Sequence, residues 1–234
     1  GKIETNTDAL IAFGAGIVGS LTFAFTDSHW FNAVEAEVYA FSTFFTAIVV
    51  WLALLWSEKA DEKGNERYIL IIAYMIGLAT GLHLLNLLTI PFVALLIYFK
   101  KFKFEWTSFA ILVLLTGLVF FIIHNVIIKG MPKIADTIGV SATALLVIII
   151  FASMVWAVLN HKQLLSIVLT SIVLVLIGYS TYAMIFIRSN QNPGIDENDP
   201  ETVEAFISYL EREQYGDVGM LPRRFKGIKP IHEV

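Results

Sequence analysis

The amino-acid sequence predicts an all-α, polytopic transmembrane bundle of about seven helices that ends in a short polar tail. Hydrophobic residues make up 57% of the 234 positions and charged residues only 15%, which lies outside the range of soluble globular domains. Of the 20 acidic and 16 basic residues, nine and five follow Arg188, so the net charge of −4 arises entirely in the tail. Lipid is therefore the expected solvent for most of the chain.

Seven hydrophobic segments approach the ~20 residues that a helix needs to cross the hydrocarbon core of a bilayer. They are residues 9–26, 38–56, 68–82, 84–99, 107–128, 138–159 and 164–187. The third and fourth are short and meet at His83, which predicts a tight helical hairpin or, alternatively, a re-entrant segment. Residues 1–188 are thus expected to form one transmembrane helical domain.

The basic residues of the connecting segments predict the orientation. With a cytoplasmic N-terminus, the inner connections would hold Lys59, Lys63, Arg67, Lys100, Lys101, Lys103 and Lys162, and the outer ones Lys129 and Lys133. This distribution satisfies the positive-inside rule. It places His83, the acidic residues between the first two spans and the tail on the outer side. The expected location is a bacterial inner membrane, with the tail in the periplasm.

Residues 189–234 form the predicted extracytoplasmic tail, which would be the start of an outer domain. Asp199 is the expected N-cap of one amphipathic helix and Pro200 its first residue. The apolar positions of this helix recur every three or four residues, at Val203, Phe206, Ile207 and Leu210. Because its polar face is acidic, packing within the protein is favoured over binding to a membrane surface.

Several classes of function are excluded or left unsupported by the residues. The chain has no cysteine, which rules out disulfides, thiolate nucleophiles and cysteine-ligated metals. An acidic charge balance gives no support to nucleic-acid binding. No P-loop, dinucleotide fingerprint or serine nucleophile elbow occurs, and no spacing of His, Asp and Glu matches a specific metal site.

The candidate catalytic residues lie between the first two spans, where Asp27, Glu35 and Glu37 occur within eleven positions. A charge inside the bilayer costs about 2.5–3.5 kcal/mol, so acidic residues that run into an apolar span usually face a cavity or a partner. On one continuous helix, Glu35 would share a face with Tyr39, and Glu37 would share the opposite face with Trp30. The alternative is a solvated interfacial loop with Trp30 as a belt residue.

Three further polar residues are candidate substrate-binding groups. His83 lies at the predicted outer end of the third span, where its imidazole could bind a phosphate or accept a proton, and Asn86 follows it. Arg188 could meet an anionic headgroup. The alternative for His83 is a hydrogen-bonded interfacial histidine, and the alternative for Arg188 is an interface anchor.

Three separated stretches resemble one family of membrane proteins. They are WFNAVEAEVYA at 30–40, IGLATGLHLLN at 76–86 and EREQYGD at 211–217. The chain resembles a large bacteroidete multi-pass family of formerly unknown function, which is related to the animal transmembrane protein O-mannosyltransferase. Such proteins belong to the GT-C class of lipid-sugar-dependent glycosyltransferases.

The resemblance implies a specific reaction and a division of roles. A sugar, expected to be mannose, would pass from a polyprenyl-phosphate donor to an acceptor protein at the outer membrane face. The acidic segment would match the second outer loop of such enzymes, and its carboxylates would deprotonate or orient the acceptor hydroxyl. The family's first transmembrane helix and first outer loop, which carries the proposed general base, are expected to precede this chain. The isolated 234 residues should therefore be inactive.

Two other classes of function stay open at this point. A transporter or lipid flippase would use the same outer polar residues as a substrate path, but it should show polar residues at mid-membrane in broken helices. A non-catalytic assembly subunit would use the tail helix to bind a partner. The clustering of ionisable residues at one membrane face favours interfacial chemistry.

Overall fold

The computed structural model of the protein describes residues 3–35, 38–211, 213 and 216. Every regular element in this part of the chain is helical, and six helices are long and apolar enough to cross a membrane. These are Asn6–Ala24, Tyr39–Glu58, Leu84–Lys101, Trp106–Ile128, Val140–Leu159 and Gln163–Ser189. The predicted all-α polytopic fold is confirmed.

The chain forms two compact units. Unit 1 comprises Gly1–Phe120 and Phe151–Thr181, and unit 2 comprises Phe121–Ile150 and Tyr182–Val234. Helix α8 (Val140–Leu159) and the 3₁₀ turn η3 (Ser180–Tyr182) contribute to both. The predicted boundary after residue 188 divides a transmembrane domain from a polar tail, whereas the two units are defined by contacts within the fold. The predicted domain boundary therefore stays a prediction.

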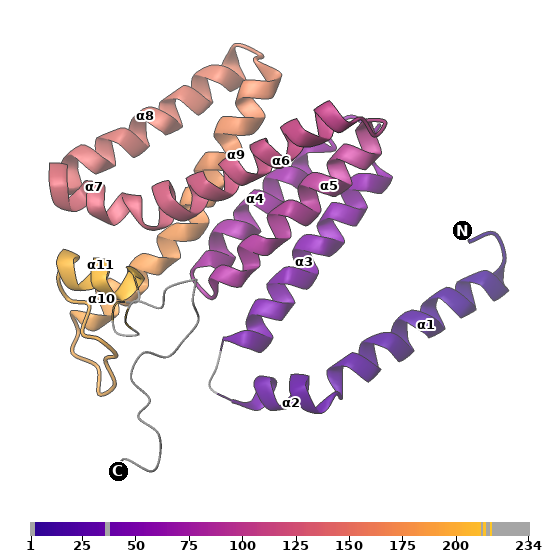
Figure 1. Cartoon of the computed structure of the whole chain (residues 1–234), viewed down its shortest axis with the longest axis horizontal. Coiled ribbons are helices and arrows are strands. Elements are labelled where there is room, and N and C mark those ends of the chain that lie inside the picture. The colour runs from indigo at the N-terminus through magenta and orange to yellow at the C-terminus, as the bar shows by residue number, and fades with distance from the viewer. Residues whose placement is uncertain (1–2, 36–37, 212, 214–215, 217–234) are drawn as a thin grey trace, which may run out of the picture. The chain divides into compact units, whose positions relative to one another are not determined.

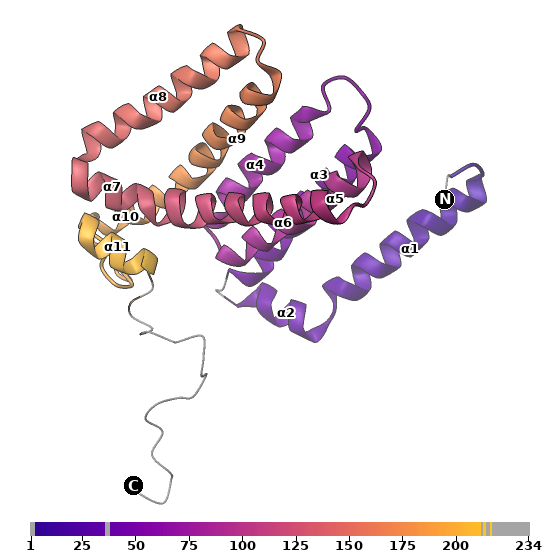
Figure 2. The same ribbon diagram turned by 45° about the horizontal axis from the view of Figure 1, so that its top comes forward.

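The elements of unit 1 are named in Figure 1. They are α1 (Asn6–Ala24), α2 (Asp27–Val34), α3 (Tyr39–Glu58), α4 (Glu66–Thr80), the 3₁₀ helix η1 (Leu84–Leu88), α5 (Thr89–Lys101), α6 (Trp106–Phe121) and α9 (Gln163–Tyr179). Helix α3 packs against both α4 and α5, and α4 also packs against α9. Figure 2 shows the same neighbours from a second direction.

The core of unit 1 lies along α4, between α3 and α9. Its buried side chains include Val49 and Leu52 from α3, Ile72 and Ile76 from α4, and Val175 from α9. Lipid tails are as apolar as these side chains, so close packing supplies much of the stabilisation between helices in a bilayer. Small residues that let two backbones approach are therefore important here.

Helix α4 explains why the sequence predicts seven spans while six helices reach full spanning length. Its 15 residues cover about 22 Å at 1.5 Å per residue, less than the ~30 Å of a bilayer core. At one end of α3, Ser42 accepts a hydrogen bond from Asn86, and at the other, Lys101 donates to the carbonyl of Ala60 at 2.7 Å. The segment with α4 therefore leads from one end of α3 back to the other, and α5 runs along α3 in the opposite direction to α4.

Helix α1 begins at a capping box and buries none of its side chains. The Thr5 hydroxyl accepts a hydrogen bond from the Asp8 amide at 3.1 Å, while Asp8 accepts one from the Thr5 amide at 3.0 Å. Together these bonds satisfy two main-chain donors that the helix start would otherwise leave unpaired. The apolar side chains of α1 face outward all round, as expected of a helix in contact with lipid.

Unit 2 contains the π-helix η2 (Ile122–Ile128), the amphipathic helix α7 (Gly130–Ile138), α10 (Ala183–Ser189) and α11 (Val203–Glu211). Phe206 of α11 is buried, and its ring lies 6.0–6.1 Å from the rings of Tyr182 and Phe186. The apolar face of the tail helix thus packs within the protein, as its composition predicts.

The predicted start of the tail helix is wrong by three residues. Helix α11 begins at Val203, and the Thr202 hydroxyl accepts a hydrogen bond from the Ala205 amide at 3.1 Å. Thr202 is therefore the N-cap. Asp199 instead has a φ of +45°, in the left-handed region, so the turn continues through Pro200 before the helix can start.

Candidate functional site

The candidate residues of unit 1 come from three elements that meet at one end of that unit. Helix α2 packs against α3, and the start of α3 packs against η1. This end, formed by α2, the first turn of α3 and η1, is called the η1 end below. It contains Asp27, Trp30, Glu35, His83 and Asn86.

The acidic segment does not continue as one helix. Helix α2 ends at Val34, and Glu35 follows with an extended backbone, φ −78° and ψ 152°. Helix α3 then starts at Tyr39. The expected sharing of one helix face by Glu35 and Tyr39 is therefore wrong, because α2 ends before Glu35 and Tyr39 begins another helix. The expected sharing of a face by Trp30 and Glu37 stays a prediction. Glu37 itself lies outside the described residues.

Asp27 and Glu35 differ in whether their charge stabilises helix α2. Asp27 occupies the first turn of α2, where its charge complements the helix dipole and stabilises the helix by about 0.3–1 kcal/mol. Glu35 is the C-cap of α2, where a negative charge is unfavourable for the same reason. Both side chains are exposed, and neither forms a hydrogen bond or ion pair with another described residue. Helix formation therefore accounts for Asp27 but not for Glu35.

Aromatic rings link α2 to the end of α1. Trp30 stacks on Phe25 with ring centroids 5.6 Å apart and an interplanar angle of 18°. His29 lies 4.5 Å from the ring of Phe23. Trp30 nevertheless leaves 53% of its surface exposed, so one face of the indole can contact a sugar or a lipid headgroup.

Asn86 is the centre of a buried hydrogen-bond network and is 2% exposed. Its amide oxygen accepts from the Thr46 hydroxyl at 2.9 Å. Its amide nitrogen donates to the Ser42 hydroxyl and to the His83 carbonyl, each at 3.0 Å. Protein groups thus satisfy both ends of the amide, which ties α3 to η1.

His83 precedes η1 and caps it. The Leu85 amide donates to Nδ1 of His83 at 3.2 Å, and the imidazole lies against the ring of Tyr39 with centroids 5.4 Å apart. His83 is half-buried, so its ring connects the buried network with the surface of the η1 end.

Arg188 lies in α10 of unit 2 and donates to the Gln191 side chain at 2.9 Å. It therefore belongs to a different unit from the five candidate residues of the η1 end.

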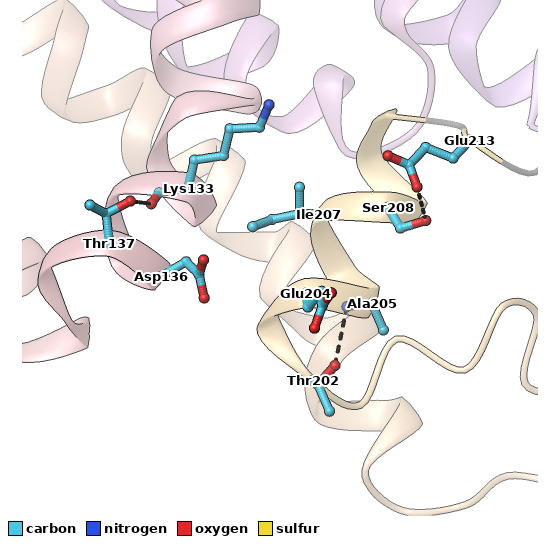
Figure 3. Close-up of a pocket in the computed structure, with 9 residues that line it drawn as sticks. All are labelled: Lys133, Asp136, Thr137, Thr202, Glu204, Ala205, Ile207, Ser208 and Glu213. Atoms are coloured by element: carbon cyan, nitrogen blue, oxygen red, sulfur yellow. Dashed lines mark hydrogen bonds between the residues drawn. The ribbon is translucent and has the colours of Figure 1, made fainter. Parts of the chain in front are cut away.

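A second candidate feature is a polar groove of about 720 Å³ between α7 and α11, both in unit 2 (Figure 3). Its lining residues are Lys133, Asp136, Thr137, Thr202, Glu204, Ala205, Ile207, Ser208 and Glu213. Beside it, Lys133 forms an ion pair with Glu211. Sequence reasoning missed this groove because Lys133 and Glu211 are 78 residues apart.

Lys133 also changes the acidity of Glu211. Its hydrogen bond to the carboxylate is the largest effect and lowers the pKa of Glu211. Burial opposes this by a smaller amount, and the positive charges of Lys133 and Lys129 lower the pKa further. The carboxylate is therefore held in its charged form at neutral pH.

The residues best placed to hold a cation are also in unit 2. Carboxylate oxygens of Asp196, Asp199 and Glu201 all lie within 4.8 Å of one another. The Asp196 carboxylate accepts from the buried Ser189 hydroxyl at 2.7 Å, so one of the three is already engaged in tying the linker to α10. Accessible carboxylates of this kind are common in proteins without a metal.

Comparison with known families gives one match. Residues 2–106 match the family model described as "Protein O-mannosyl-transferase TMEM260 N-terminal domain". The matched segment is somewhat less than half of the chain and covers α1 to α5, including the whole η1 end. The resemblance to the animal O-mannosyltransferase is confirmed over this segment. Comparison with curated proteins and with solved structures gives no match.

Proposed function

From the relation of residues 2–106 to the N-terminal domain of this O-mannosyltransferase family, we propose that the chain is part of a GT-C-type membrane glycosyltransferase. The donor is a polyprenyl-phosphate-linked sugar, with mannose as the sugar, and the acceptor is a protein. Transfer takes place at the outer face of a bacterial inner membrane. The family match is the observation that carries this proposal.

The proposed reaction exchanges one bond at the anomeric carbon of the sugar. The bond from that carbon to the phosphate oxygen breaks, and a bond to a hydroxyl oxygen of the acceptor forms. The hydroxyl proton passes to a carboxylate, and polyprenyl phosphate leaves with the bonding electrons. The protein must therefore supply a proton acceptor near the hydroxyl and hydrogen-bond donors near the phosphate.

Glu35 is our first candidate for the carboxylate in the described part of the chain. It is exposed at the η1 end, and its position at the C-terminus of α2 has no stabilising role in that helix. Glu37 belongs to the same proposal from sequence alone, and Asp27 is the third candidate. The exposed ring of Trp30 is a candidate contact for the sugar or the lipid. Arg188, in unit 2, is a candidate contact for an anionic headgroup from sequence alone.

The proposal is tested by measuring sugar transfer in membranes that contain the full-length protein. Labelled polyprenyl-phosphate mannose is supplied with an acceptor protein, and wild type is compared with Glu35→Gln and Glu37→Gln. Loss of a proton-transfer group should lower the rate about 100-fold or more. Glu62→Gln is the matched control, because Glu62 is an exposed carboxylate beyond the opposite end of α3.

Three results are informative. Transfer by wild type that either loop substitution abolishes, with normal membrane insertion, supports the proposal. Transfer that survives both Glu35→Gln and Glu37→Gln would show that these carboxylates are not part of the active site, although the protein would still be a glycosyltransferase. Absence of transfer by wild type with several donors would contradict the proposed glycosyltransferase function and favour a role in transport or assembly.

A further inference from the structure

The connection between α5 and α6 lies at the membrane surface because it is short. One helix of spanning length ends at Lys101 and the next begins at Trp106, which leaves residues 102–105 between them. A chain of this length reaches out and back by at most about 9 Å. The headgroup layer on each side of the hydrocarbon core is itself about 5–8 Å thick. The connection therefore lies within or beside the headgroups.

Residues 100–106, called segment 100–106 below, alternate basic and aromatic side chains in the sequence KKFKFEW. All of them are exposed, and Phe102, Phe104 and Trp106 expose 62%, 51% and 77% of their surface. Aromatic rings are enriched at headgroup level, and a lysine there extends its ammonium group toward water. The composition of segment 100–106 thus fits its depth.

A buried tyrosine holds segment 100–106 in one shape. The hydroxyl of Tyr98, which is 3% exposed, accepts a hydrogen bond from the main-chain amide of Glu105 at 3.1 Å. The ring of Phe102 stacks on Tyr98 with centroids 5.8 Å apart, and the ring of Phe104 lies 5.5 Å from that of Phe109. A ligand that binds here therefore pays less ordering entropy than one that binds a flexible loop.

The three lysines of segment 100–106 differ in whether the fold already uses them. Lys101 donates to the Ala60 carbonyl at 2.7 Å and forms an ion pair with Asp61 at 3.1 Å. Lys100 and Lys103 form no hydrogen bond or ion pair with another residue in the described part of the chain. Lys100 lies in the last turn of α5, where a cation stabilises the helix. Lys103 lies beyond that helix, which therefore does not account for its charge.

The exposed surface of segment 100–106 is positive. Asp61 offsets the charge of Lys101, and Glu105 is the acidic residue of the segment. Lys100 and Lys103 outnumber this one carboxylate, and both present their charge at headgroup depth. A positive surface at that depth favours anionic over zwitterionic headgroups.

We propose that segment 100–106 binds the headgroups of anionic phospholipids. Lys100 and Lys103 contact the phosphate oxygens, while the rings of Phe104 and Trp106 hold the segment at headgroup depth. Each of the two lysines strengthens the preference for anionic lipid about fivefold. The positive-inside rule predicts the cytoplasmic leaflet for this contact. The proposal is independent of the proposed sugar transfer.

Tryptophan fluorescence of the full-length protein in phosphatidylcholine vesicles tests the proposal. A small fraction of the lipid is replaced by brominated phosphatidylglycerol or, in matched vesicles, by brominated phosphatidylcholine, because bromine quenches a nearby indole. The difference between wild type and Trp106→Phe isolates the signal of Trp106. Brominated phosphatidylglycerol should quench Trp106 more strongly than brominated phosphatidylcholine does. Equal quenching by the two lipids would overturn the proposal.

Substitutions that remove one charge each show which side chains select the lipid. Lys100→Gln and Lys103→Gln should each lower the relative binding constant for phosphatidylglycerol about fivefold, and Glu105→Gln should raise it. Lys162→Gln is the matched control, because Lys162 is an exposed lysine in the connection between α8 and α9. A preference that survives loss of both Lys100 and Lys103, with normal helix content by circular dichroism, would overturn the proposal.

A competition experiment separates a lipid headgroup from a free anion. Sodium chloride should weaken the preference at Trp106, since salt screens exposed charges. Inorganic phosphate at the same ionic strength should weaken it no further. Stronger displacement by phosphate than by chloride would assign Lys100 and Lys103 to a soluble anion and overturn the phospholipid proposal.

Discussion

Gly77 of α4 and Gly178 of α9 lie at a point where the two helix backbones touch. A methyl group added to Gly77 would meet the Val175 carbonyl oxygen at 2.5 Å, and one added to Gly178 would meet the Leu78 nitrogen at 2.5 Å. Both contacts are with main-chain atoms, which cannot move aside as a flexible side chain can. The IGL stretch of the family resemblance therefore contains a packing residue of the core of unit 1.

We predict that Gly77→Ala destabilises unit 1 by about 1–3 kcal/mol, the usual cost of overpacking a well-packed site. Gly117→Ala in α6 is the matched control, because an added methyl there has no atom within 4 Å and alanine is the better helix former. Unfolding in detergent, followed by circular dichroism, measures both variants. Equal stability of Gly77→Ala and wild type would show that α4 and α9 do not touch at this point.

The Asn86 network makes a second prediction about stability. Thr46→Val removes the donor to the Asn86 amide oxygen but keeps the shape of the side chain. The free energy of unfolding should fall by about 1 kcal/mol, since a buried acceptor loses its partner and such bonds in membranes are modest. Thr43→Val should cost less, because its lost bond is within α3 and exposed. Indistinguishable losses would argue against a buried network at Asn86.

The structure also shows which parts of this region the sequence could predict. The seven apolar segments and the reversal near His83 follow from hydropathy and length alone. The break at Glu35 does not, because residues 30–40 contain no Gly or Pro that would predict the end of a helix. The start of α11 at Val203 was missed for a related reason. Asp199 and Pro200 have helix-start chemistry, but Asn198 and Asp199 have a left-handed backbone, with φ of +65° and +45°.

The ion pair between Lys133 and Glu211 predicts a pH dependence in unit 2. The pKa of Glu211 is lowered in the folded protein, chiefly by its hydrogen bond to Lys133. A carboxyl with a lowered folded pKa contributes stability above its unfolded pKa, and this contribution is lost as the pH falls through the folded value. The docking of α11 on α7 should therefore be insensitive to pH near neutrality and weaken in acid, below the ordinary range of a glutamate.

Spin labels can measure this docking because the chain contains no cysteine. Labels at Thr137→Cys and Glu204→Cys, on α7 and α11, should give one narrow distance distribution at neutral pH that broadens in acid. Lys133→Met should broaden it at neutral pH, while Lys129→Met, which removes only a longer-range charge, should have a smaller effect. Because the pair is partly exposed, the change in docking free energy should be at most about 1 kcal/mol. A distribution that Lys133→Met leaves unchanged would contradict a role of the pair in docking.

The last prediction concerns the number of membrane crossings, on which the sequence and helix length disagree. Single cysteines at Ser28, Glu62, Lys103 and Asp136 would be labelled in intact cells with a membrane-impermeant maleimide. If α4 crosses the bilayer despite its 15 residues, Glu62 and Lys103 must lie on the same side, because α4 and α5 then make two crossings between them. The bond from Lys101 to the Ala60 carbonyl requires the same arrangement.

The positive-inside rule then assigns the side. Ser28→Cys and Asp136→Cys should react from outside, and Glu62→Cys and Lys103→Cys should react only after the cells are opened. Opposite accessibility of Glu62→Cys and Lys103→Cys would mean that α4 does not cross. The hydrogen bond from Lys101 to the Ala60 carbonyl would then be wrong, and η1 would not share a membrane face with α2.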